Sequence, residues 1–265
     1  MPTKARRPSV EVVTRWIADG FGQGLGAEYK PFMYVRDVPS VGLSSMLTSR
    51  LTRRTHHYLS KLELSVHLLA EFEEGTQDIR EQFALLPWDE TQQIADDTGI
   101  RHPIYPGTRT PIVMTTDLLI TQVKDGRVAH RAISVKPAGD FSLRTTDKLW
   151  IEQMYWKRRG VEWRLVTEED IPKHKAVNLK FFELARITDV CSSVRVSPRE
   201  FSQRFEQLWQ RDKRYIELLS AAARSVGVDN ETAHLLMGKA VWARESALDI
   251  DSSSLSHRSL VVLKH

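Results

Sequence analysis

The sequence predicts two domains: an α/β domain over residues 1–170 and a mostly helical, winged-helix-like domain over residues 171–265. In the first part, segments with helical spacing of apolar residues alternate with β-prone runs. After Thr167 the pattern changes to three helical segments and a short terminal β-prone run, the order expected of a winged helix. A chain of 265 residues is long enough for two modest domains.

Composition indicates a soluble globular protein. Hydrophobic residues make up 41% and charged residues 27%, which argues against extensive disorder. No apolar run approaches the roughly 20 residues that span a bilayer, and no apolar segment follows the basic N-terminus, so neither a membrane nor a secretory signal is expected. The lone cysteine, Cys191, cannot form an internal disulfide and is expected to be buried, in a protein of the reducing cytoplasm.

The first elements follow from caps and spacing. Residues 9–20 form a predicted amphipathic helix with Ser9 as N-cap, and the glycines that follow it predict a turn rather than a phosphate loop. Residues 33–38 and 46–58 are expected to be extended. Residues 60–72 are predicted to be a helix with Ser60 as N-cap, which places Glu63 at the third helical position.

The next segments predict most of a sheet. Residues 77–85 are expected to form a strand and residues 89–97 a short acidic helix. The β-prone runs 111–123 and 128–135 flank a tight-turn signal that contains Asp125 and Gly126. A helix is predicted from about Thr146 to Arg159, ending at Gly160, and a half-buried strand over residues 161–165.

The second domain is predicted from three helical segments, residues 172–187, 198–225 and 230–246. A serine-rich turn at residues 252–254 then leads to a β-prone run at residues 259–263, the expected ribbon of the winged-helix-like module.

A net charge of +4 and a pI near 9.2 favour a polyanionic partner without establishing one. A cluster of basic residues lies just ahead of the Glu63 helix and is a candidate DNA-binding surface. The alternative is an ordinary solvated face. The cluster comprises Arg50, Arg53, Arg54, His56 and His57.

Three polar residues are expected to share one face of the hairpin. If Asp125 and Gly126 form a two-residue loop, counting outward places Asp117 opposite Ser134. Because side chains alternate along a strand, Lys136 lies on that face too, unless a bulge shifts the register.

A carboxylate in an apolar strand needs a partner or a metal ion. Phosphodiester hydrolysis uses Mg²⁺ to activate water and to offset charge on the leaving oxygen, and a lysine stabilises the developing negative charge. Glu63 would supply a second carboxylate. The alternative is that Asp117 and Lys136 form a structural ion pair and that Glu63 belongs to a capping box or is solvated.

Four stretches, in order, resemble the TnsA endonuclease family, whose members are subunits of bacterial heteromeric cut-and-paste transposases. The resemblance covers most of the first 170 residues and extends into the helix that carries Glu152. The later part matches by architecture more than by motif. The stretches are residues 59–66, 78–87, 114–117 and 135–138.

This resemblance implies a restriction-endonuclease-like fold for the first domain. It implies that Glu63 and Asp117 are metal ligands and Lys136 the catalytic lysine, with Glu73 and Glu152 as further acidic positions near the site. One departure is Ser134, where such sites usually have Gln or Glu two residues before the lysine. Its hydroxyl is shorter and neutral, so it is expected to be a weak metal ligand that acts through water.

The function that the resemblance implies is Mg²⁺-dependent hydrolysis of the 5′ strand at transposon ends in bacterial cytoplasm, with Mn²⁺ able to substitute. The implied partners are double-stranded DNA, a TnsB-like transposase that cuts and joins the 3′ end, and a TnsC-like AAA+ ATPase that docks on the C-terminal domain. Two alternatives remain: a stand-alone restriction-type or junction-resolving nuclease, and a non-catalytic adapter of the transposase complex.

Overall fold

The computed structural model describes residues 7–34, 44–190 and 194–264, and the chain divides into two compact units, Met1–Ile171 and Pro172–His265. Cys191 and the predicted extended residues 35–38 lie outside the described residues. Among the helices described, none has the length and apolar character that crossing a membrane requires.

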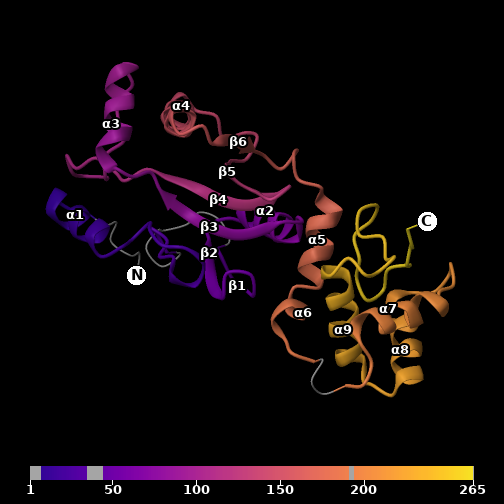
Figure 1. The fold of residues 1–265 in the computed structure, drawn as a ribbon. Helices are drawn as coiled ribbons and strands as arrows, with labels where there is room; N and C mark the ends of the chain where they lie inside the picture. Colours follow the sequence, from indigo (N-terminus) through magenta and orange to yellow (C-terminus); the bar gives the residue numbers. More distant parts are fainter. Residues whose placement is uncertain (1–6, 35–43, 191–193, 265) are drawn as a thin grey trace. The chain divides into compact units, whose positions relative to one another are not determined.

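A four-stranded sheet forms the centre of the first unit (Figure 1). Its order is β3 (Thr76–Ala84), β4 (Thr115–Lys124), β5 (Arg127–Val135) and β6 (Glu162–Val166). The first three strands are antiparallel, and β6 runs parallel to β5. This parallel step is possible because α4 (Leu143–Arg158) carries the chain back between them.

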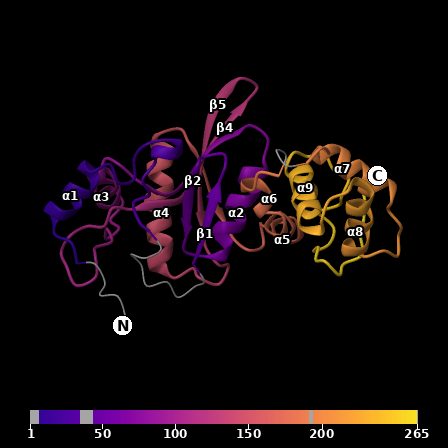
Figure 2. The ribbon, with the colours of Figure 1, turned by 90° about the horizontal axis from the view of Figure 1, so that it is seen from below.

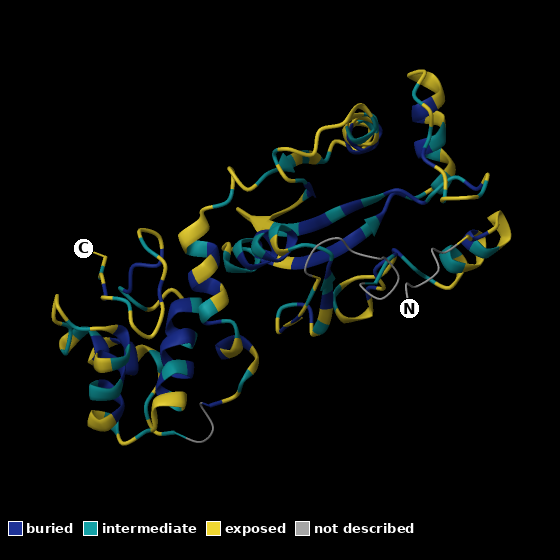
Figure 3. Ribbon diagram, turned by 180° about the vertical axis from the view of Figure 1, so that it is seen from behind, coloured by how far each residue is buried: buried dark blue, intermediate teal, exposed yellow. Residues whose placement is uncertain are grey.

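Helices cover both faces of this sheet, so most of β3, the first part of β4 and the last part of β5 are buried, whereas the hairpin end of β4 and β5 is exposed (Figure 3). On one face, α4 and α3 (Trp88–Asp97) enclose a core in which Ile151 and Trp156 pack with sheet residues such as Leu119. On the other face, α2 (Lys61–Phe72) packs against β3 and β4. The remaining elements of this unit are α1 (Val10–Ala18), the short η1 (Gly26–Glu28), and the hairpin of β1 (Ser45–Ser49) and β2 (Arg54–Tyr58).

The β4–β5 hairpin has the predicted register and projects from the sheet (Figure 2). Lys124 pairs with Arg127 across a loop in which Asp125 and Gly126 both have positive φ, 52° and 73°. Two successive positive φ angles are typical of the type I′ turn, whose twist suits a hairpin. The ladder continues without a bulge to its last pair, Leu118 and Ile133, and extending this register by one residue places Asp117 opposite Ser134.

Two boundaries in the first unit differ from the prediction by three residues or more, and the stretch 46–58, predicted to be extended throughout, is a hairpin with a turn between Ser49 and Arg54. The strand predicted to begin at residue 111 begins at Thr115, because Pro111 forms an isolated bridge with Ile104 and the Ile112 N–H donates to the Pro103 carbonyl, outside the sheet. The helix predicted from Thr146 begins at Leu143, because the Ser142 side chain accepts a hydrogen bond from the Thr145 N–H and caps the helix one turn earlier.

The second unit is helical, but two of its predicted helices are each divided. The segment 172–187 forms α5 (Lys173–Phe181) and α6 (Leu184–Ile187), and the segment 198–225 forms α7 (Pro198–Gln207) and α8 (Tyr215–Val226). The break before α8 follows from a polar run and a new cap, in which the Glu217 carboxylate accepts from the Arg214 N–H.

The last helix, α9 (Asn230–Trp242), ends four residues before the predicted end. In the described part of the terminal run, Leu260 and Leu263 make isolated bridges, to Arg214 and Leu248, in place of the expected ribbon. The three predicted segments are therefore helical but form five helices, and in the described residues the expected ribbon is reduced to isolated bridges.

Candidate active site

Glu63 is fixed in the first turn of α2 by its own N-cap. The Ser60 hydroxyl donates to Glu63 Oε1 at 2.8 Å and accepts from the Glu63 N–H at 3.2 Å. The Leu59 N–H donates to Glu63 Oε2 at 3.1 Å. Glu63 therefore does take part in the helix cap. It is, however, only 5% exposed, whereas glutamates are mostly exposed to solvent. Burial, together with the negative charge of Asp117, raises the pKa of Glu63 to about 7.

Asp117 and Lys136 meet at the open end of the β4–β5 ladder. Asp117 Oδ2 accepts from the Val135 N–H at 2.7 Å and from Lys136 Nζ at 3.1 Å. The charge of Asp117 raises the pKa of Lys136, so this side chain remains an ammonium group at neutral pH. Within the described chain, the second oxygen of Asp117 makes no hydrogen bond and stays available to a ligand.

Glu152 reaches the same place from α4. It is buried, and its Oε1 accepts from the hydroxyls of Thr116 at 2.6 Å and Ser134 at 2.5 Å. Burial and the charge of Asp117 raise the pKa of Glu152 to about 7. Ser134 is 1% exposed and donates its hydroxyl hydrogen to Glu152. Its side chain is therefore buried against this carboxylate.

A pocket of about 490 Å³ in the first unit lies at this site. Its walls include Asp117, Lys136 and Glu152, together with two residues that the sequence did not single out as functional, Gln82 and Lys148. Glu63 is not part of the lining, but its carboxylate is 3.5 Å from the Gln82 amide nitrogen. Three carboxylates (Asp117, Asp140 and Glu152), two ammonium groups and an amide therefore line one cavity, and the Glu63 carboxylate lies next to the amide.

Gln82 could not be recognised without the pairing of β3 with β4. The register that joins Glu81 to Leu118 and Phe83 to Thr116 places Gln82 across from Asp117. The connection between these strands is 30 residues long, so no tight turn in the sequence predicts their register. Lys148 is expected on the pocket side of α4 from its spacing to Glu152, four residues further along the helix.

Glu73 lies elsewhere, contrary to the expectation that it is near the site. Glu73 is the C-cap of α2, ten positions after Glu63, which corresponds to about 15 Å along a helix. Glu73 Oε2 instead accepts from Arg131 at 2.6 Å and from the Gln122 amide at 2.6 Å, at the other end of the sheet.

The basic cluster does not form one DNA-binding surface. Arg54 and His56 are turned inward, where both bond the fully buried carboxylate of Glu81, at 2.5 Å and 2.8 Å. The Glu81 carboxylate also accepts from the backbone N–H of His57. A buried acid requires such partners, and these hold the pKa of Glu81 well below its usual range. Only Arg50 and Arg53 of the cluster are exposed.

The carboxylates fit a hard divalent cation of the Mg²⁺ type. In the described part of the chain, no three His, Cys, Asp or Glu side chains are placed to hold a metal ion as a group. Mg²⁺ does not need such a cage, because it is commonly bound through one or two carboxylates, with waters and substrate phosphates completing the shell. The free oxygen of Asp117 and the raised pKa values of Glu63 and Glu152 indicate negative charge that a cation would offset.

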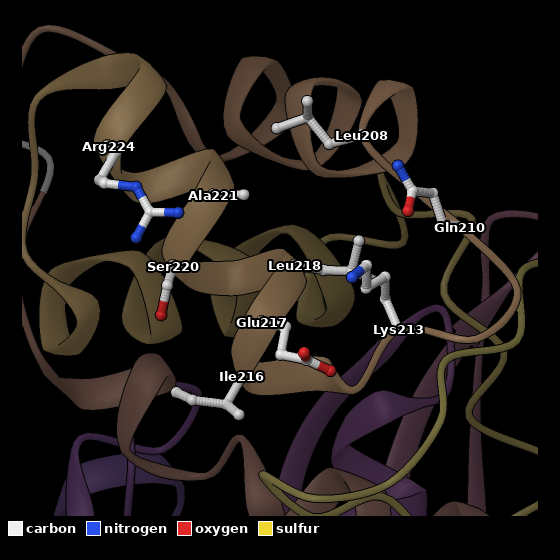
Figure 4. A pocket seen from close by; sticks show the side chains of 9 residues that line it. All are labelled: Leu208, Gln210, Lys213, Ile216, Glu217, Leu218, Ser220, Ala221 and Arg224. Carbon is white, nitrogen blue, oxygen red and sulfur yellow. The ribbon is translucent and has the colours of Figure 1, made fainter.

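A separate pocket of about 500 Å³ lies in the second unit, against α8 (Figure 4). Its only acid is Glu217, whose carboxylate is used in the cap of α8. A single capping carboxylate does not make a hydrolytic centre. Its lining consists of Leu208, Gln210, Lys213, Ile216, Glu217, Leu218, Ser220, Ala221 and Arg224.

Comparison with known proteins points to the same part of the chain. Residues 73–168 match a family model described as the N-terminal part of TnsA-like endonucleases. This range contains Gln82, Asp117, Lys136 and Glu152 but not Glu63. The chain is 41% identical over 183 residues to the Tn7 transposition protein TnsA of Escherichia coli. The match covers 69% of this chain and 66% of that relative, slightly less than two thirds of the relative's length.

Proposed function

The chain belongs to the TnsA endonuclease family, and from this premise we propose that it is the metal-dependent DNA endonuclease subunit of a cut-and-paste transposase. The observation that carries the proposal is that Asp117, Lys136 and Glu152 line one pocket. Glu63 lies beside this pocket, with its carboxylate 3.5 Å from the amide nitrogen of Gln82. The proposed fold of the first unit is restriction-endonuclease-like, and that of the second unit winged-helix-like.

In the proposed reaction, Asp117 and Glu63 hold Mg²⁺, for which Mn²⁺ substitutes. The ion, when bound, activates the attacking water and offsets charge on the leaving oxygen. Asp117 offers its free oxygen and keeps the other on Lys136 and the Val135 N–H, so its carboxylate is held in one orientation. Lys136 stays protonated and stabilises negative charge as it develops on the phosphate.

Lys148 is suited to bind DNA beside the reacting phosphate. It lines the pocket, and within the described residues it makes no hydrogen bond or ion pair. The nearby positive charges of Arg144 and Lys136 contribute, after burial, to lowering its pKa. Two lysines in the lining of one cavity, with the charge of Arg144 close by, favour a polyanion as the substrate. Arg50 and Arg53 remain candidates for contacts to more distant phosphates.

In the proposed complex, this subunit hydrolyses the 5′ strand at the transposon end. A TnsB-like transposase cuts and joins the 3′ end, and a TnsC-like AAA+ ATPase docks on the second unit. The relative whose name specifies Tn7 transposition supports this setting.

Strand-mapped cleavage of labelled transposon-end DNA tests the proposal, with the chain, its partner proteins and Mg²⁺ present. The wild-type chain is expected to cut the 5′ strand, and Asp117→Asn to lose that cut while still assembling with the partners. Equal cutting by Asp117→Asn would contradict the assignment. Efficient cutting of naked DNA by the isolated chain would favour a stand-alone nuclease, and assembly without any 5′ cut would favour an adapter.

A further inference from the structure

Gln82 lies within β3, two residues before the strand ends, and has a backbone conformation that is unusual for a strand. Its φ is 47°, in the left-handed region, although the ladder on either side keeps one register. A residue with a Cβ atom adopts this conformation at a cost of roughly 1–2 kcal/mol. Strain of this kind persists where the surrounding structure enforces it, and it is frequent at functional sites.

Gln82 is 1% exposed, and its side chain lies between Glu63 and Thr115. Its Nε2 is 3.5 Å from Glu63 Oε2, and its Oε1 accepts from the Thr115 hydroxyl at 3.3 Å. Since a carboxylate oxygen accepts hydrogen bonds, the amide nitrogen belongs on the Glu63 side, which leaves Oε1 with one unused lone pair. Gln82 also lines the pocket and lies across the ladder from Asp117.

Gln82 offers a side-chain oxygen for a metal ion, which the strand of Lys136 does not offer. The position two residues before the lysine is Ser134, and its hydroxyl is held by Glu152 beneath the carboxylates. The described residues also include no group of three His, Cys, Asp or Glu side chains placed to hold a metal. An amide oxygen is a suitable ligand for Mg²⁺ or Mn²⁺, because these ions favour carboxylate, carbonyl and water oxygens.

We infer that Gln82 provides the third oxygen ligand of the metal site, through Oε1, next to Asp117 and Glu63. The inference rests on the proposed function, because it assumes that the two carboxylates bind a divalent ion. In this arrangement Gln82 from β3 takes the place of the Gln or Glu that such sites usually have two residues before the lysine, where this chain has Ser134. The strained backbone is then explained as the conformation that brings the amide of a strand residue between Glu63 and Asp117.

A calorimetric titration of Mn²⁺ into the full chain tests this inference without relying on cleavage. Gln82→Ala is expected to weaken Mn²⁺ binding by roughly tenfold or more, as loss of a supporting group at a metal site does. Gln82→Glu keeps an oxygen at the same reach and is expected to bind Mn²⁺ at least as tightly as the wild type. Gln122→Ala is the matched control, since this glutamine bonds Glu73 and Thr76 away from the pocket.

The outcomes separate this inference from the proposed function. If Asp117→Asn abolishes Mn²⁺ binding but Gln82→Ala binds like the wild type, the inference is overturned and the proposed function stands. If both Gln82 variants bind weakly, with unfolding temperatures in EDTA close to that of the wild type, Gln82 acts only as a donor to Glu63 and the ligand role is wrong. If the wild type itself binds no Mn²⁺, the metal dependence in the proposed function fails as well.

Discussion

Replacing Glu152 with glutamine is expected to stabilise the metal-free protein at alkaline pH. Glu152 is 5% exposed, and burial next to Asp117 raises its pKa from 4.5 to about 7. Glutamine has nearly the same shape and keeps an oxygen that accepts from Thr116 and Ser134, so these hydrogen bonds are retained. The substitution therefore removes a buried charge without removing a buried side chain.

The direction of the effect follows from proton binding. The folded carboxyl binds its proton more tightly than the unfolded one, so the folded state loses stability as the pH rises from about 4.5 to about 7. Above this window the ionised carboxyl destabilises the fold by about 3 kcal/mol, since one pH unit between the two pKa values corresponds to about 1.36 kcal/mol. Below pH 4.5 both states carry the proton and the cost disappears.

Urea unfolding in EDTA at pH 5 and pH 8 measures this difference. Glu152→Gln is expected to exceed the wild type by about 3 kcal/mol at pH 8 and by no more than about 1 kcal/mol at pH 5. Glu169→Gln, a change at an exposed carboxylate, serves as the control and is expected to have little effect at either pH. Equal stability of Glu152→Gln and the wild type at pH 8 would refute the description of Glu152 as a buried, destabilising charge.

Three further predictions concern other parts of the chain. Glu81→Ala is expected to cost about 3–5 kcal/mol in thermal unfolding, because it leaves Arg54 and His56 buried without their partner; a loss below 1 kcal/mol would contradict this. Lys148→Ala is expected to weaken DNA binding and to reduce the slope of log K against log salt by about 1, and an unchanged slope would remove Lys148 from the DNA contact. Residues 172–265 are expected to unfold cooperatively as an isolated fragment, since Phe201, Phe205 and Tyr215 belong to a core of their own; a circular dichroism melt without a transition would show otherwise.

The parts of the site that sequence could predict are those fixed by local chemistry. The Asp125 and Gly126 turn determines the β4–β5 register, and that register places Asp117 opposite Ser134 next to Lys136. The Ser60 cap likewise determines where α2 begins and therefore where Glu63 lies. In each case a few adjacent residues specify the geometry.

The parts that sequence could not predict depend on contacts between distant segments. The role of Gln82 depends on the β3–β4 pairing and on a positive φ, which the sequence does not predict because the residue is not a glycine. Arg54 and His56 are neighbours of exposed basic residues in the sequence, yet they turn inward because the buried Glu81 on another strand needs them. The burial of Glu152, similarly, is a consequence of how α4 packs on the sheet.

In the proposed function, this chain makes one of the two cuts that release a transposon, with Asp117 and Lys136 in its active site. If the partner makes the 3′ cut and supplies the nucleophile for joining, loss of the 5′ cut leaves the element attached to its donor, and replication fuses donor and target into a cointegrate.

Long-read sequencing of insertion products in cells tests this directly. Wild-type protein is expected to give simple insertions, whereas Asp117→Ala and Lys136→Ala, expressed and assembled normally, are expected to give cointegrates. Simple insertions at the wild-type frequency with either variant would mean that the 5′ strand is cut by another active site.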